Sequence, residues 1–321
     1  MKTKQQMELF HQDLLEEVKK IDELGKLYHN IYNLKYFCLD SQTKEYIKEN
    51  PVIKRNIKIN EEKITINLRP QILPNDREIE LRYLSEREQN ILDFIIYKWG
   101  KTQTYDNNGY PILMIGFNEI HTKLGYNGKQ IKDSLYLLST YKIDFETKYY
   151  DGIIPNQFLD SIIIRRGRTN KTLIRLSIGL KKYIEDNKYI IMNYEKLFNL
   201  KNRISKILFK RICISNYMDY DIKEKQKFII RETIFKMLEQ YGISLSNRLK
   251  RSRCIKELNN SLEELKENQI IDVYKLTPTA DRKDYTLEVL LNMRFSKSFS
   301  INQKMKEYLI EQTPKPTIIK E

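Results

Sequence analysis

The sequence is poor in the residues that build metal centres and disulfide frameworks. Three cysteines and three histidines occur among 321 residues, and no two cysteines stand in a C-x-x-C spacing. They are Cys38, Cys213, Cys254, His11, His29 and His121. Isolated cysteines of this kind are typical of a reduced cytosolic protein and predict neither a zinc finger nor a set of disulfides. We therefore expect no metal site and a cytoplasmic location.

The motifs of common DNA-acting enzymes are also missing. No His-x-His pair exists, so the metal site of a rolling-circle nickase cannot form in its usual way. Leu124 lies three residues after His121, where a tyrosine recombinase would carry an arginine. The chain has no G-x-x-x-x-G-K-[ST] phosphate-binding loop. We expect no catalytic residue, no cofactor and no enzymatic activity, and a metal-dependent nuclease is the least favoured alternative.

Long apolar runs are absent as well. No run approaches the roughly 18 residues that a spanning helix needs, and acidic residues interrupt the N-terminal segment where a signal peptide has its apolar core. What the chain has in excess is positive charge, with 57 lysines and arginines against 43 aspartates and glutamates and a formal net charge of +14. With 40% hydrophobic residues, this indicates a globular protein with a polyanionic partner. We expect that partner to be nucleic acid rather than a membrane.

The N-terminal part predicts an extension that precedes the main domains. Apolar residues over 7–24 recur three and four positions apart, which predicts an amphipathic helix. That helix either pairs with a second copy in a homodimer or packs on its own domain, because Glu17 falls where a strict heptad wants an apolar residue. Residues 30–78 predict short mixed elements, and two prolines mark 68–77 as a linker. We expect a helical extension and linker over 1–79.

Residues 80–193 predict a first domain made of a helix, a helix–turn–helix and a hairpin. Ser85 and Glu88 form a capping box in front of a helix that ends at Gly100. In chain order the further predicted elements are a strand over 110–117, a short helix over 117–125, a helix over 129–142, and hairpin strands over 143–150 and 161–168. This is the element order of a winged helix.

Residues 194–300 repeat the pattern and precede a tail over 301–321. The predicted elements are helices over 202–218 and 231–242, a basic helix within 244–271, and strands over 270–276 and 285–291. "SLYLLSTYKI" (134–143) also aligns without gaps on "SLEELKENQI" (261–270), with four identities. The sequence therefore predicts a duplicated α+β, helix-rich fold, with two tandem winged-helix domains after the helical extension.

The basic helix sorts its charges by end, with cations first and carboxylates last. This order opposes the helix macrodipole, which favours acids at the N-terminus. Thirteen residues separate Gly242 from Lys256, whereas three separate Gly125 from Lys129, so an insertion either lengthens the helix or forms a basic lead-in loop. Either arrangement places cations at the end that enters a major groove in helix–turn–helix proteins.

Several cations and one asparagine are candidates for DNA contact. In the second domain they are Asn247, Arg248, Lys250, Arg251, Arg253 and Lys256. We expect Arg251 and Arg253 to read bases, Lys250 and Lys256 to hold phosphate, and Asn247 to do either. Ile255, Leu258, Leu262 and Leu265 are the expected core positions, on a face that these cations do not share.

The first domain offers a weaker set of candidates. Lys129 and Lys132 are expected on the outer face of its second helix–turn–helix helix, although Asp133 among them would repel phosphate. The cluster "RRGR", with Arg165, Arg166 and Arg168, falls at a predicted strand end, where it suits contact with the DNA backbone or minor groove. A solvated helix face or hairpin tip is the alternative for these cations.

The chain resembles the iteron-binding replication initiators of bacterial plasmids over roughly 80–295. The segments that carry the resemblance are "LSEREQNILDFIIYK", "FNEIHTKLGYNGKQIKDSLYLLSTYKIDF" and "TIFKMLEQYGISLSNRLKRSRCIKELNNSLEELKENQIIDVYKL". The resemblance implies binding to directly repeated double-stranded origin DNA, origin melting, recruitment of a host initiator and helicase, and an exchange between dimers and monomers. It does not extend to the N-terminal 80 residues. A winged-helix transcriptional or partition regulator is the alternative.

Overall fold

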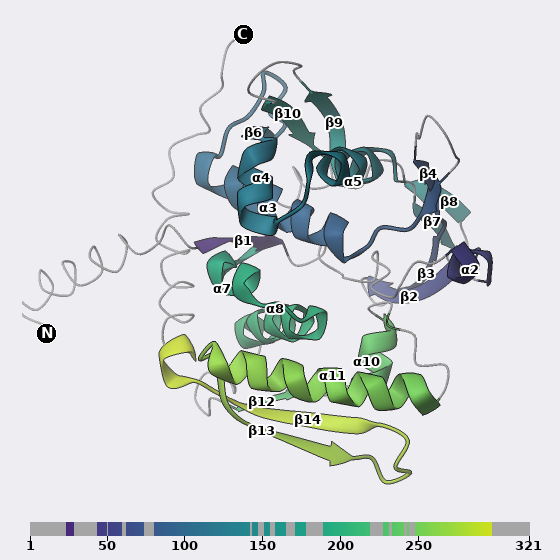
Figure 1. Ribbon diagram of the computed structural model, residues 1–321, viewed down its shortest axis with the longest axis vertical. Coiled ribbons are helices and arrows are strands. Elements are labelled where there is room, and N and C mark those ends of the chain that lie inside the picture. The colour runs from purple at the N-terminus through teal and green to yellow at the C-terminus, as the bar shows by residue number, and fades with distance from the viewer. Residues whose placement is uncertain are drawn as a thin grey trace, which may run out of the picture.

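The computed structural model is a mixed helix-and-strand protein (Figure 1). It describes residues 24–28, 44–49, 51–59, 62–73, 80–141, 143–146, 151–154, 158–164, 171–177, 189–218, 227–230, 233–240, 243 and 248–296. Within these ranges no helix is both long and apolar enough to cross a membrane.

The first unit is built from three helices and a three-stranded antiparallel sheet. Its elements are α3 (Glu86–Thr102), β6 (Ile112–Gly116), α4 (Phe117–Leu124), α5 (Gly128–Thr140), β9 (Leu159–Ile164) and β10 (Lys171–Leu176). The strand order is β6-β10-β9. The expected capping box of Ser85 and Glu88 is present, but α3 continues past Gly100 and ends where Gln103 adopts a left-handed conformation. Gly125 ends α4 with a positive φ of 76°, which glycine adopts without strain.

The second unit has the same element order. Its elements are α8 (Arg203–Met218), β12 (Lys227–Ile230), α10 (Ile234–Gln240), α11 (Arg248–Glu267), β13 (Ile271–Pro278) and β14 (Tyr285–Leu291). The strand order is β12-β14-β13, so the last strand again lies in the middle of the sheet. The two units therefore share helix order, strand order and strand direction, as the sequence similarity between 134–143 and 261–270 predicts.

The described residues that precede α3 are mostly strand, with one short helix, where the sequence analysis expected short mixed elements over 30–78 within an extension over 1–79. Its elements are β1 (Leu24–Tyr28), α2 (Lys44–Glu49), β2 (Ile53–Ile59), β3 (Glu62–Leu68), β4 (Gln71–Leu73) and β5 (Glu80–Arg82). "IKRNIKI" and "EKITINL" place β-branched isoleucines at alternate positions, which is a strand pattern. The predicted helix over 7–24 lies outside the described residues except for Leu24, which begins β1.

The expected hairpin of the first unit has a different composition. β7 (Ile143–Glu146) pairs with β3 and with β8 (Asp151–Ile154), in a four-stranded sheet of order β2-β3-β7-β8. The hairpin of the unit is formed by β9 and β10 instead. β10 buries Thr172, Ile174 and Leu176 at alternate positions, so it has the inward face that the middle strand of this sheet requires.

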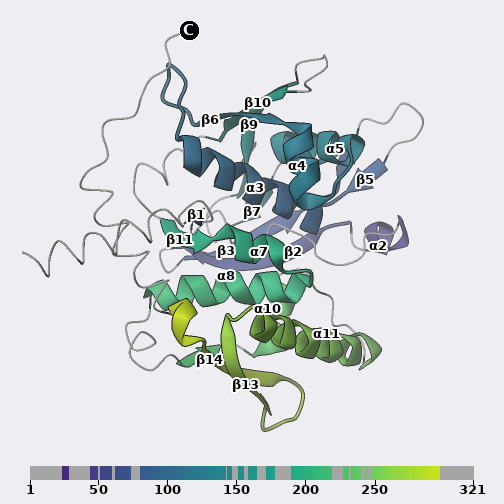
Figure 2. The same ribbon diagram turned by 60° about the vertical axis from the view of Figure 1, so that its left-hand side comes forward.

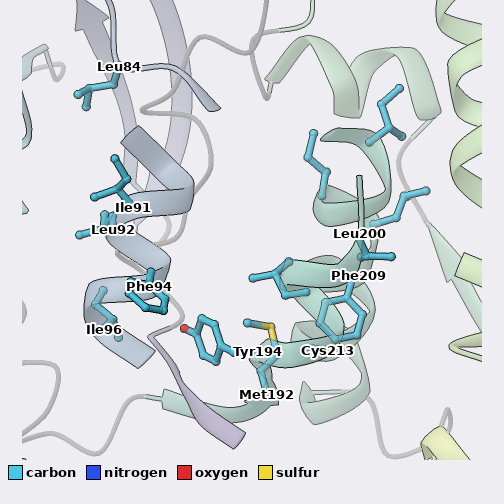
Figure 3. Packing of buried hydrophobic residues seen from close by; sticks show 14 of the residues in the cluster. Leu84, Ile91, Leu92, Phe94, Ile96, Met192, Tyr194, Leu200, Phe209 and Cys213 are labelled. Carbon is cyan, nitrogen blue, oxygen red and sulfur yellow. The ribbon is translucent and has the colours of Figure 1, made fainter. Parts of the chain in front are cut away.

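The two units meet where α3 packs on α8. Figure 3 shows Phe94 of α3 and Tyr194 between the helix α3 and the helices of the second half of the chain, and both belong to one buried apolar cluster. Lys210 of α8 forms a buried ion pair with Asp93 of α3. β11 (Tyr189–Asn193) pairs with β1 and leads into the short helix α7 (Tyr194–Asn199), which joins the two units along the chain.

Candidate nucleic-acid interface

From Arg248 on, the residues inserted relative to the first unit are helical and belong to α11. The alignment of Ser134 on Ser261 sets an offset of 127 positions, which places the first residue of α5, Gly128, on Ile255. α11 begins at Arg248 and has 20 residues, against 13 in α5. The extra length is therefore two helical turns at the N-terminal end. Of the two arrangements that the sequence left open, the structure has the longer helix and not the basic loop.

The outer face of α11 carries Arg253 and Lys256. Both side chains are exposed, and they lie three residues apart. Neither forms an ion pair with another residue of the part of the chain that the structure describes. Asn260 continues this face one turn further on and is exposed too, although the sequence analysis did not single it out.

The inner face of α11 differs from the expected one in one position. Cys254 is buried together with Leu258, Leu262 and Leu265, whereas Ile255 is only partly buried. Arg251 precedes Cys254 by three residues, so it lies on the same side of the helix as the core positions, contrary to expectation. Its side chain is nevertheless exposed.

The carboxylates of α11 bind groups of their own unit. Glu257 accepts two hydrogen bonds from the guanidinium of Arg203, at 2.8 and 3.0 Å. Glu264 accepts from the backbone amides of Lys201 and Asn202, at 2.5 and 3.1 Å, directly before α8 begins. These contacts explain why the acids gather at the C-terminal end of α11, where they meet the positive N-terminus of α8.

The hydrogen bonds to Glu264 keep this group ionised. Burial raises the pKa of the Glu264 carboxyl, but the hydroxyl of Ser205, the two amides and the side chain of Asn202 donate to its charged form. Together these hydrogen bonds lower the pKa of Glu264 by more than burial raises it, so this pKa lies below the ordinary glutamate value. Glu263 also has a partner, because the hydroxyl of Tyr274 on β13 donates to it at 2.8 Å.

In the first unit, α5 presents a smaller basic face. Lys129 and Lys132 are exposed, as expected, and Tyr136 one turn later is 38% exposed. No ion pair involves either lysine within the described ranges. Asn127 and Gln130 form a capping box that begins the helix immediately before this face. Asp133 is only partly exposed.

The remaining candidate residues are placed only in part. Arg248 and Lys250 belong to the first turn of α11, and their side chains are not among those described. Asn247, Arg165, Arg166 and Arg168 lie outside the described residues. The three arginines fall between the end of β9 and the start of β10 in the chain.

The turn between β13 and β14 carries two cations that the sequence analysis missed. Arg282 and Lys283 are both exposed there. Asp284, at the base of the turn, accepts hydrogen bonds from the amides of Phe235 at 2.8 Å and Lys236 at 3.3 Å, and so caps the start of α10. The turn is thereby tied to the helix pair. The signal in the sequence is the "DRKD" run, in which two cations stand between two aspartates.

The outer helices of both units lie on one side of the molecule. In Figure 1, α5 lies in front of β9 and α11 lies in front of the β12-β14-β13 sheet. After the 60° turn of Figure 2, both helices have moved to the same side of the view. In both views α5 lies in the upper part of the molecule and α11 in the lower part, with α8 between them.

Comparison with solved structures places this fold among known ones. The chain is similar to a crystal structure of domains 2 and 3 of RctB, determined on selenomethionine derivatives, with a TM-score of 0.53 and 9% sequence identity over 82% of this chain and 99% of that chain. A second crystal structure of RctB domains 2–3 matches with a TM-score of 0.41 and 10% identity over 82% of this chain and 97% of that one. At 9% identity the first likeness shows a shared fold. No protein-family model and no curated protein sequence matches the chain.

Proposed function

We propose that this protein is a sequence-specific double-stranded DNA-binding protein that initiates plasmid replication by binding directly repeated origin sequences. In this proposal both units are winged-helix domains, and α5 and α11 are their reading helices. The observation that carries the proposal is the presence, in two units of the same topology, of an outer helix with exposed cations that form no ion pair among the described residues: Lys129 and Lys132 on α5, and Arg253 and Lys256 on α11. RctB is a replication initiator, so the shared fold supports the assignment.

The chemistry of the exposed side chains assigns different tasks to them. The guanidinium of Arg253 can bond bidentately to a guanine, and the amide of Asn260 suits adenine. Lys256, Lys129 and Lys132 are point charges that suit phosphate. Arg282 and Lys283 would touch the backbone beside the groove occupied by α11. All of these tasks are binding tasks, and we propose that the protein itself catalyses no reaction.

The partners beyond DNA follow from the resemblance to plasmid initiators. A homodimer that represses, a monomer that initiates, and contacts to a host initiator and helicase in the cytoplasm are the partners proposed on that basis. None of them is needed for the DNA-binding part of the proposal, which rests on the two units alone.

Footprinting on DNA from its own replicon tests the proposal. We expect protection of several copies of one direct repeat, and a preference for duplex over single-stranded DNA. The logarithm of the affinity should fall with the logarithm of salt concentration, with a slope near −0.9 for each phosphate contacted. Binding that ignores salt, or no binding to duplex DNA, would contradict the proposal. Protection of a single operator without repeats would favour a transcriptional or partition regulator.

A further inference from the structure

Two adjacent residues of α7 reach toward different units. Glu195 accepts a hydrogen bond from the hydroxyl of Tyr97 on α3 at 3.4 Å and forms an ion pair with Lys123 on α4. The ammonium of Lys196 donates to the backbone carbonyl of Asn268 at 2.9 Å, one residue beyond the end of α11. One short helix therefore contacts the helix–turn–helix of the first unit and the reading helix of the second.

Both contacts are made at places that matter for the position of a reading helix. α4 leads into α5 through the turn at Gly125, so an anchor on Lys123 acts next to the first reading helix. The carbonyl of Asn268 lies at the negative end of α11, where a cation satisfies an otherwise unpaired carbonyl and interacts favourably with the macrodipole. Each of the two charges of α7 thus holds one unit.

The remainder of α7 is fixed by aromatic packing. The ring centroids of Tyr194 and Phe198 lie 5.3 and 5.8 Å from the ring centroid of Tyr97. The centroid of Phe198 also lies 5.7 Å from that of Phe94. Lys123 also lies over the ring of Phe198, at 5.6 Å. The helix is therefore seated on the first unit, and Lys196 connects that seat with the second.

The length of α11 amplifies any movement at its C-terminal end. Arg253 precedes Asn268 by fifteen residues, which corresponds to about 22 Å along a helix. A rotation of α11 by a few degrees about its C-terminal end would therefore displace its basic end by about one or two ångströms. A displacement of that size is enough to misalign a side chain with a base edge.

We propose that Glu195 and Lys196 are positioning residues that fix the spacing between the two reading helices, so that the protein selects DNA by the distance between its two half-sites. This inference rests on the proposed function, because it assumes that α5 and α11 bind the same duplex. It adds a specificity that the base-reading side chains alone do not provide, since the distance between the two half-sites is then selected as well as their sequences.

The test uses the full chain and a series of duplexes. Hydroxyl-radical footprinting of a selected high-affinity duplex first defines the half-site of each unit, and one to four base pairs are then inserted between them. For the wild-type protein we expect two inserted base pairs to lower affinity by about 100-fold, because simultaneous engagement is lost. For the double variant Glu195→Gln, Lys196→Met we expect weaker binding to the original site but a loss of less than about fivefold on insertion.

Matched variants separate positioning from folding. Asn199→Ala, at the exposed end of α7, should keep the wild-type spacing dependence, and Lys196→Arg should restore it because the cation is retained. Lys196→Met alone removes one partly buried hydrogen bond and replaces the double variant in the test if that variant does not fold. Thermal melting checks each variant.

The outcomes are distinct. If the variants depend on spacing as strongly as the wild type, α7 does not position the helices and the inference fails. If the wild type binds duplex DNA but tolerates every insertion, the inference fails and the proposed function stands. If the wild type does not bind duplex DNA at all, the proposed function fails and the inference with it.

Discussion

The charged residues of α11 fall into two groups, which differ in whether they bind groups of their own unit. Glu257, Glu263 and Glu264 bind an arginine, a tyrosine and a helix N-terminus of their own unit. Arg253 and Lys256 point away from the unit and find no ion-pair partner within the described ranges. The sorting that the sequence displays is therefore half structural and half available for a ligand. Only contacts across the fold distinguish these halves, since the sequence shows the same charged residues in both.

The outward cations lead to a prediction on base recognition. Arg253→Ala should lower binding to the specific duplex about 5- to 150-fold, since a bidentate guanine contact is worth about 1–3 kcal/mol. It should lower binding to a scrambled duplex much less. Lys256→Ala should weaken both alike and flatten the salt slope by about one unit. Lys266→Ala, an exposed lysine at the opposite end of the same helix, is the control and should change neither. Competition binding measures all three, and equal losses for Arg253→Ala on both duplexes would exclude a base contact.

Glu264 leads to a prediction on stability and its dependence on pH. Its pKa is lowered in the folded state, so its contribution is fully present above the ordinary glutamate pKa and is lost as the pH falls through the lower folded value. Glu264→Gln should therefore cost about 1–3 kcal/mol at neutral pH, because amide donors before α8 lose a charged acceptor. The variant should also lose less further stability on acidification than the wild type. Urea unfolding at several pH values checks this, with Glu267→Gln, an exposed neighbour, as the control.

At the scale of the elements, a serine–glutamate hydrogen bond joins the first and third helices in both units, but the helices that supply the two residues are exchanged. In the first unit Ser134 of α5 donates to the buried carboxylate of Glu88 on α3, at 2.5 Å. In the second, Ser205 of α8 donates to Glu264 on α11, also at 2.5 Å. The first and third helices are joined by a serine–glutamate contact in both cases, but the glutamate lies on the first helix in one unit and on the third in the other. In both units the glutamate also caps the start of the first helix.

The elements that the sequence predicts well are those with local signals. The capping box at Ser85 and the glycine stop at Gly125 mark α3 and α4, because caps act within a few residues. The pairing partners of strands have no such local signal. β7 follows α5 directly and was expected to form the hairpin of the first unit, yet it pairs with β3, in which Ile66 faces Phe145. No local pattern specifies a partner some 80 residues away. Among the site residues, Cys254 replaces Ile255 in the core because packing, not spacing alone, decides the register.

The contact between α3 and α8 yields a prediction on the buried ion pair. Asp93 and Lys210 are 1% and 2% exposed, so each is costly to bury without the other. Asp93→Ala should lower the free energy of unfolding by about 3–5 kcal/mol, because it leaves the ammonium of Lys210 without its counter-charge. The double variant Asp93→Leu, Lys210→Met should recover most of this loss, because an apolar pair of similar volume often matches a buried ion pair. Chemical denaturation measures the cycle, and equal losses in the single and double variants would contradict it.

At the scale of the whole molecule, strands that precede α3 pair with strands that come later in the chain. β3 contributes to the sheet that contains β7 and β8, which follow α5 in the chain. β1 pairs with β11, which leads into α7 and so into the second unit. β1 thus lies beside α3 and α7, at the seam between the units.

This arrangement predicts different outcomes for two truncations that differ by one strand. A chain that begins at residue 24 keeps β1, and its pairing from Leu24 with Asn193 to Tyr28 with Tyr189 is retained. A chain that begins at residue 29 leaves β11 without its partner strand and removes five backbone-paired residues beside α3 and α7. We expect the second truncation to lower the melting temperature by about 1.5–3 °C relative to the first, since a loss of about 1–2 kcal/mol corresponds to a shift of this size for a chain of about 300 residues. Light scattering on the first truncation and on the full chain then shows whether residues 1–23 hold two copies together. A drop from dimer to monomer mass would assign them that role, and an unchanged mass would exclude it. Equal melting temperatures for the two truncations would show that β1 does not hold the seam between the units.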